Sequence, residues 1–75
     1  METILVVEDE ENILEALRYN ISKEGYQFLS ASDGETALSL ARENSPDLII
    51  LDVMIPRLDG FEVCRILRRE TNIPI

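Results

Sequence analysis

The feature that most constrains this chain is an apolar run that ends in a carboxylate, within residues 46–60. Residues 48–51 (LIIL) are followed directly by Asp52 and then by a stretch punctuated by Pro56 and Gly60. A short run of Leu and Ile bounded by turn residues predicts a strand buried on both faces of a parallel sheet. Asp52 is then expected at the carboxyl end of that strand, where open α/β folds keep their binding sites.

The same pattern, an apolar run followed by carboxylates, occurs at the start of the chain, where residues 4–7 (ILVV) precede Glu8 and Asp9. If these two strands are neighbours, their ends lie ~4.8 Å apart, and Glu8, Asp9 and Asp52 converge. Clustered carboxylates repel one another unless a cation lies between them, and oxygen ligands of this kind suit Mg²⁺ or Mn²⁺. A metal held beside an Asp permits phosphoryl transfer onto that Asp. A solvated strand end remains the plainer interpretation of Asp52 taken alone.

The spacing of apolar residues predicts three helices. In chain order, the first covers residues 12–24, the second ends near residue 43, and the third covers residues 60–69. Ser32 is expected to be the N-cap of the second of these helices, with Glu35 at the reciprocal position of a capping box. Residues 26–31 predict an edge strand, and 73–75 predict the first step of a further strand. Strands that alternate with helices predict an α/β fold with right-handed crossovers.

The composition narrows the class of protein. Seventy-five residues make a single small domain, 1–75, and one Cys excludes an internal disulfide. The absence of His excludes a Ser/His/Asp triad, and the net charge of −8 argues against direct contact with nucleic acid or an anionic membrane. No apolar run approaches the ~20 residues that span a bilayer, so the cytoplasm is the expected compartment.

The amino-acid sequences of three segments resemble those of a known family, the receiver domain of two-component response regulators. The matching segments are residues 4–10 (ILVVEDE), the Asp33-Gly34 pair before an Ala/Leu helix, and residues 46–60 (PDLIILDVMIPRLDG). The resemblance implies a flavodoxin-like, doubly wound parallel sheet with strands in the order 2-1-3, part of an expected 2-1-3-4-5. It covers the whole chain, which ends after the third helix of such a domain.

The resemblance also implies roles for individual residues. Asp52 would be the phosphoacceptor, and Asp9 and Asp52 would hold Mg²⁺ together with the backbone carbonyl of Met54. Glu8 would act on the ion through bound water. The family's Ser/Thr, aromatic and Lys positions of the fourth and fifth strands have no counterpart within these 75 residues.

The same resemblance implies partners. A sensor histidine kinase would dock on the first helix, with Ile13, Ala16 and Asn20 as candidate contacts, and Pro56 is a further candidate. The sequence of residues 54–60 is most similar to that of receivers that carry a winged-helix DNA-binding output domain, which is absent from this chain. Ile13 and Ala16 could equally be ordinary margins of the core.

Two other functions remain open at this point. An incomplete receiver could act as a self-associating interaction module, through the outer edge of the strand over 48–51. A phosphatase with an aspartyl-phosphate intermediate is the enzymatic alternative. Such enzymes place a second Asp two residues after the nucleophile, and this chain has Met54 there.

Overall fold

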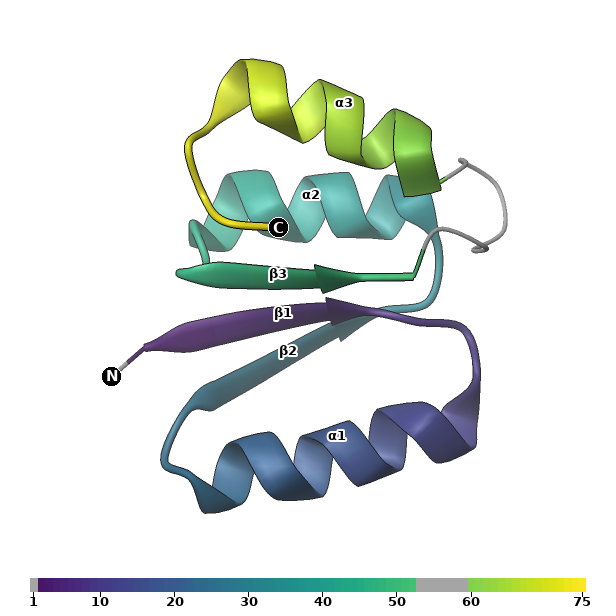
Figure 1. Cartoon of the computed structure of the whole chain (residues 1–75), viewed down its shortest axis with the longest axis vertical. Coiled ribbons are helices and arrows are strands. Elements are labelled where there is room, and N and C mark those ends of the chain that lie inside the picture. The colour runs from purple at the N-terminus through teal and green to yellow at the C-terminus, as the bar shows by residue number, and fades with distance from the viewer. Residues whose placement is uncertain (1, 53–59) are drawn as a thin grey trace.

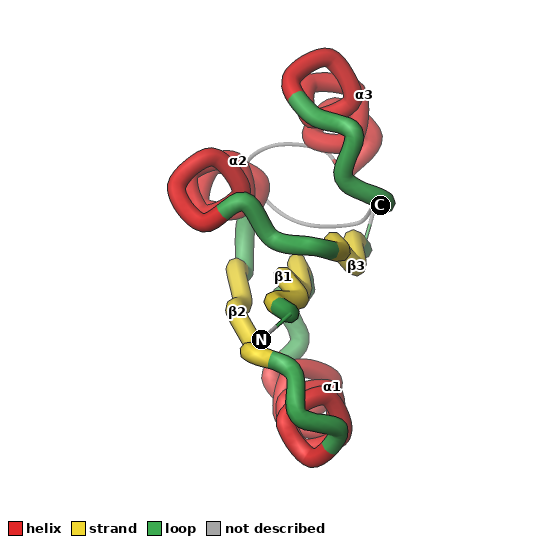
Figure 2. Tube along the Cα trace, turned by 90° about the vertical axis from the view of Figure 1, so that its left-hand side faces the viewer, coloured by secondary structure: helices red, strands yellow, loops and turns green. Residues whose placement is uncertain are grey.

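The computed structural model describes residues 2–52 and 60–75, and within them strands and helices alternate. The elements are β1 (Thr3–Val7), α1 (Glu11–Lys23), β2 (Gln27–Ala31), α2 (Gly34–Asn44), β3 (Leu48–Leu51) and α3 (Gly60–Glu70). The strands form a parallel sheet in the order β2-β1-β3, with α1 on one face and α2 and α3 on the other (Figures 1 and 2). The predicted fold class and strand order are confirmed.

The sheet separates two apolar clusters, because successive side chains of a strand point to opposite faces. Leu5 and Val7 of β1 face α2 and α3, whereas Ile4 and Val6 face α1. The larger cluster consists of Leu5, Val7, Ala31, Ala37, Leu38, Ala41, Ile49, Val63 and Leu67. The smaller one is built on Ile4, Val6 and Leu14. The central strand therefore supplies the core on both sides.

The pairing register brings the carboxyl ends of the strands level with one another. Val7 pairs with Ala31 of β2 and with Leu51 of β3. The backbone continues this pairing past the strand ends, since the Asp52 N–H donates to the Val7 carbonyl at 3.0 Å. The residues after β1 and β3 consequently begin at the same edge of the sheet.

The prediction that β3 is buried on both faces is wrong. Ile49 is 1% exposed, but its neighbour Ile50 is 39% exposed. Ile49 faces the cluster under α2 and α3, so Ile50 faces the side of α1. On that side α1 packs against β2 and does not extend over the outer part of β3 (Figure 2).

The predicted start of α2 is also wrong by one residue. Asp33, not Ser32, is the N-cap, and its carboxylate accepts hydrogen bonds from the Thr36 N–H at 2.8 Å and the Thr36 hydroxyl at 3.1 Å. Glu35 lies in the first turn, and neither of these two bonds involves it. The Asp33–Thr36 spacing satisfies the same N-cap geometry as Ser32–Glu35, and the carboxylate is the better acceptor.

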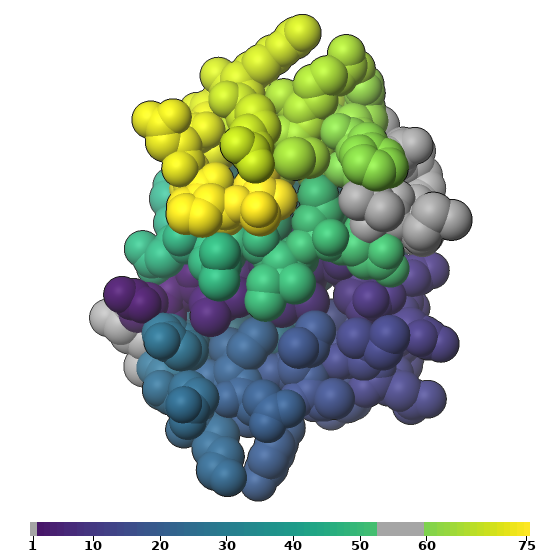
Figure 3. Space-filling view, viewed as in Figure 1, coloured from purple at the N-terminus to yellow at the C-terminus, as the bar shows by residue number. Residues whose placement is uncertain are grey.

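The last residues follow the outer edge of β3 without forming a regular strand. The Ile49 N–H donates to the Pro74 carbonyl at 2.9 Å, and Ile73 and Ile75 pack against the larger cluster. This segment lies between α3 and β3 on the face drawn in Figure 3. The predicted open edge of β3 is thus covered in part. None of the helices in the described ranges has the length and apolarity of a membrane span.

Candidate metal centre

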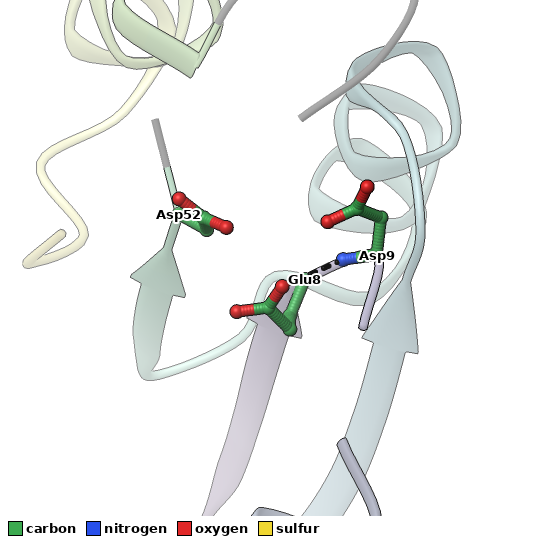
Figure 4. Close-up of side chains that lie close together, drawn as sticks. All are labelled: Glu8, Asp9 and Asp52. Carbon is green, nitrogen blue, oxygen red and sulfur yellow. Dashed lines mark hydrogen bonds between the residues drawn. The ribbon is translucent and has the colours of Figure 1, made fainter. Parts of the chain in front are cut away.

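Three acidic side chains meet at the carboxyl end of the sheet. Glu8 and Asp9 follow β1, and Asp52 follows β3. One carboxylate oxygen from each of these residues lies within 4.8 Å of the others. Figure 4 shows the three carboxylates around a common space beyond the strand ends. The convergence expected from two acid-tipped neighbouring strands is present in the structure.

Glu8 is the most enclosed of the three, with 9% of the residue exposed. Its Oε2 accepts hydrogen bonds from the backbone N–H of Asp9 at 3.0 Å and of Glu10 at 3.1 Å (Figure 4 draws the first). Burial raises the pKa of Glu8, and the charge of Asp52 and a hydrogen bond with it act in the same direction. The two backbone N–H groups oppose this rise in pKa because they favour the carboxylate form.

Exposure increases across the cluster. Glu8 is buried, Asp52 is half-buried and Asp9 is exposed. Asp52 is fixed through its own N–H, which is bonded to Val7, and Asp9 follows directly on the anchored Glu8. A ligand could therefore approach from the side of Asp9 and reach Asp52 before Glu8.

The donor set fits a hard divalent cation. All three side chains offer carboxylate oxygens, the ligands that Mg²⁺ prefers, and the open side leaves room for water or phosphate oxygens. The charged neighbour that acts on the buried Glu8 is another carboxylate, Asp52. A cation at this position would relieve that repulsion, whereas soft metals would call for Cys or His ligands.

The candidate kinase contacts lie on an exposed face of α1, the helix that begins three residues after Glu8. Ile13 is 42% exposed, and Ala16 and Asn20 are exposed as well. The Asn20 side-chain amide donates to the Ala16 carbonyl at 2.9 Å. Ile13 and Ala16 are members of neither buried cluster. Met54 and Pro56, the remaining candidate residues, lie outside the described residues.

Sequence reasoning missed the backbone that holds Glu8. The N–H groups of Asp9 and Glu10 point back at the carboxylate in the connection that leads into α1, for which Glu10 is the N-cap residue. A signal for this was present, because a carboxylate just before a helix start is placed to accept from N–H groups that the helix leaves unbonded.

Comparisons with known proteins identify the relatives of this chain. Residues 4–75 match the family described as the response regulator receiver domain. The chain is 57% identical over 67 residues to the alkaline phosphatase synthesis transcriptional regulatory protein PhoP of Bacillus subtilis (strain 168), covering 89% of this chain and 28% of that protein. It is 47% identical over 75 residues to the transcriptional regulatory protein AfsQ1 of Streptomyces coelicolor, covering 100% of this chain and 33% of that protein.

Solved structures agree with the sequence matches. The BeF3-activated N-terminal receiver domain of Klebsiella pneumoniae RstA superposes with a TM-score of 0.90 at 28% identity, over 95% of this chain and 61% of that one. A chain from the complex of histidine kinase ThkA with response regulator protein TrrA gives 0.87 at 41% identity, over 95% and 61%. The chain thus spans about a third of its curated relatives. It belongs to the family of response regulator receiver domains.

Proposed function

We propose that this chain is the phosphoacceptor part of a two-component signalling protein, in which Asp52 accepts a phosphoryl group from a sensor histidine kinase. The observation that carries the proposal is the meeting of Glu8, Asp9 and Asp52 at one edge of the sheet. A carboxylate oxygen of Asp52 forms the new bond to phosphorus, and the bond from phosphorus to the donor nitrogen breaks. The product is an acyl phosphate, and the donor imidazole leaves with the electron pair of the broken bond.

The cation that we assign to this site is Mg²⁺, with Mn²⁺ as a substitute. Asp9 and Asp52 would bind it directly with the Met54 carbonyl, and Glu8 would act through a bound water. The indirect role suits Glu8, because one of its oxygens is already engaged by two backbone N–H groups. When bound, Mg²⁺ supplies positive charge for the phosphoryl oxygens. The protein's own part is to hold Asp52 in place and to aim its carboxylate at the open side.

The proposed contacts for the kinase are Ile13, Ala16, Asn20 and Pro56. The first three share an exposed face of α1, and α1 begins directly after Glu8, Asp9 and Glu10. A kinase that reaches Asp52 would pass beside this face. The related TrrA was solved in complex with a histidine kinase, which supports this class of partner.

The proposed output is control of transcription from the cytoplasm. The curated relatives are transcriptional regulators, and this chain matches about a third of their length. DNA contact is assigned to a separate output domain, since the chain itself carries a net charge of −8. We assign it neither enzymatic turnover on other substrates nor contact with a membrane.

Phosphorylation by a small donor tests the proposal. The chain is incubated with acetyl phosphate and Mg²⁺, and its intact mass is measured. We expect the mass of one phosphoryl group on the wild type and on Asp33→Asn, a control at the same end of the sheet. Asp52→Asn should gain none, and EDTA should abolish labelling of the wild type. Labelling of Asp52→Asn, or labelling that ignores EDTA, would contradict the proposal.

Self-association is the second candidate function, and an apolar groove favours it. The groove is lined by Leu48, Ile49, Ile50, Leu51, Phe61, Cys64 and Ile75. Phe61 is 69% exposed and Ile50 is 39% exposed, next to the outer edge of β3. Exposed strand edges pair readily with other strands. Sedimentation of the chain should then reveal dimers or larger species that Ile50→Lys reduces, and a wild type that stays monomeric at every concentration would rule this candidate out.

A further inference from the structure

At the end of the sheet opposite the acidic cluster, a pair of reciprocal hydrogen bonds joins β1 to β3. The backbone N–H of Thr3 donates to Asp47 Oδ2 at 2.7 Å. In return, the backbone N–H of Asp47 donates to the Thr3 carbonyl at 2.8 Å. We call Thr3 and Asp47, joined by these two bonds, the register latch. The Thr3 hydroxyl also donates to Gln27 Oε1 at 3.3 Å, which steadies Thr3 from the side of β2.

The connection from α2 to Asp47 passes through two residues, Ser45 and Pro46. Ser45 caps the end of α2 in the left-handed region, at φ 45° and ψ 61°, and its N–H donates to the Ala41 carbonyl at 3.1 Å. Pro46, which follows, is fully buried, and its ring fixes its own φ. The turn before β3 thus leads directly into Asp47, whose two bonds to Thr3 align β3 with β1.

The apolar strands alone do not distinguish the observed register from a neighbouring one. Residues 4–7 (ILVV) and 48–51 (LIIL) are apolar throughout, so a displacement by two residues would return every side chain to its own face. Such a displacement would move Asp52 by ~6.6 Å along β1, at ~3.3 Å per residue. The carboxylate oxygens of the acidic cluster now lie within 4.8 Å of one another, and this arrangement would be lost.

We propose that Asp47 is a positioning residue for the acidic site: by bonding to Thr3 it selects the β1–β3 register that brings Asp52 beside Glu8 and Asp9. The reciprocal pair requires Thr3 and Asp47 to be adjacent, and a displaced register breaks both bonds. A single exposed carboxylate is enough for this purpose, because it needs only to favour one of two similar apolar pairings. Its bond to an N–H is charge-assisted and therefore stronger than a neutral one.

The test uses Mg²⁺ affinity, which rests on the proposed function, and a direct measurement of register, which does not. Mg²⁺ binding is followed by titration calorimetry, and the register by NOEs between the backbones of Leu5 and Ile49, a pair in the structure. Asp47→Ala should bind Mg²⁺ about twofold more weakly, because two similar pairings would leave about half of the chains in the competent register. Its Leu5–Ile49 NOEs should weaken to the same extent.

Two further variants separate positioning from general stability. Asp47→Asn keeps an acceptor oxygen and should restore both readouts to nearly the wild-type level. Asp33→Ala removes the α2 cap and lowers stability without touching the latch, so its Mg²⁺ affinity and NOEs should stay unchanged. If Asp47→Ala is not folded, it is measured in trimethylamine N-oxide, which favours the compact state.

The outcomes distinguish this inference from the function on which it rests. A folded Asp47→Ala that keeps the wild-type NOEs would overturn the positioning role, and so would equal losses of affinity in Asp47→Ala and Asp33→Ala. A wild type that does not bind Mg²⁺ would overturn the proposed function instead. In that case the NOEs of Asp47→Ala alone decide whether the latch selects the register.

Discussion

The two ends of the sheet use the same chemical group in opposite ways. At the carboxyl ends of the strands, burial raises the pKa of Glu8, and the like charge of Asp52 raises it further. At the amino ends, the Asp47 carboxylate accepts a hydrogen bond from the backbone N–H of Thr3, at the start of the neighbouring strand. A carboxylate stabilises the fold at one end and carries an electrostatic cost at the other. Such a cost at the mouth of an open α/β sheet is typical of a site prepared for a ligand.

The helices extend this contrast, because they run antiparallel to the strands (Figure 1). The last turns of α2 and α3 lie at the amino end of the sheet, the same end as Asp47. There Arg42 donates two hydrogen bonds to Glu70, at 2.9 and 2.7 Å. This pairing lowers the pKa of Glu70. At the amino end of the sheet an ion pair therefore joins two helices, whereas the carboxyl end gathers three carboxylates.

The larger expected effect is a gain of stability on losing an acid from the carboxyl end. Asp52→Asn removes the charge that acts on the buried Glu8. In EDTA it should raise the free energy of unfolding by about 1 kcal/mol, the size of a Coulomb repulsion at ~4 Å in a high dielectric. Urea denaturation followed by circular dichroism measures the change.

The matched variant at the amino end should change stability in the opposite direction. Asp47→Ala deletes an acceptor from the latch and should lower the free energy of unfolding in the same EDTA buffer. With saturating Mg²⁺ the wild type should gain stability, by RT ln(1 + [L]/Kd), and Asp52→Asn should gain little. If Asp52→Asn were less stable than the wild type in EDTA, the contrast between the two ends would be wrong.

The smaller expected effect concerns pH at the amino end. Arg42 lowers the pKa of Glu70 below its ordinary 4.5, so the pair stabilises the fold above that value. This stability is lost as the pH falls through the lowered pKa of the folded state, because the native carboxylate must then take up a proton. Thermal melting over this acidic range should show a steeper loss for the wild type than for Glu70→Gln.

Arg42→Gln provides the second arm of that measurement. It removes the partner that lowers the pKa, so its melting temperature should follow the same shallow pH dependence as that of Glu70→Gln. The double variant should add nothing to either single one. Identical acid slopes for the wild type and both single variants would mean that the ion pair contributes nothing to stability.

The alternation of strands and helices could be predicted because each element has a strong local signal. Residues 48–51 are a closed apolar run between turn residues, and the structure has β3 at these positions. The helices over 12–24 and 60–69 were placed to within one residue at each end, at Glu11–Lys23 and Gly60–Glu70. Periodicity identifies an element well because it sums over many residues, whereas an end depends on one or two.

The errors lie where two local solutions compete or where distant elements decide. Ser32 and Asp33 both satisfy an N-cap spacing, and the backbone of Asp33 takes the extended conformation that a cap requires. The exposure of Ile50 depends on how far α1 reaches across the sheet, which no pattern within LIIL records. No local pattern predicts the bond between Asp47 and Thr3, because it crosses 44 positions of sequence.

The sequence by itself determined the elements, their alternation and the acids at the ends of two strands, since these depend on neighbours along the chain. The tertiary structure decided which strands are adjacent, in which register they pair and how deeply each acid is buried. Those properties depend on contacts between residues far apart in the chain. Two apolar strands accept more than one alignment, and the carboxylates of Glu8, Asp9 and Asp52 meet in the one that the fold selects.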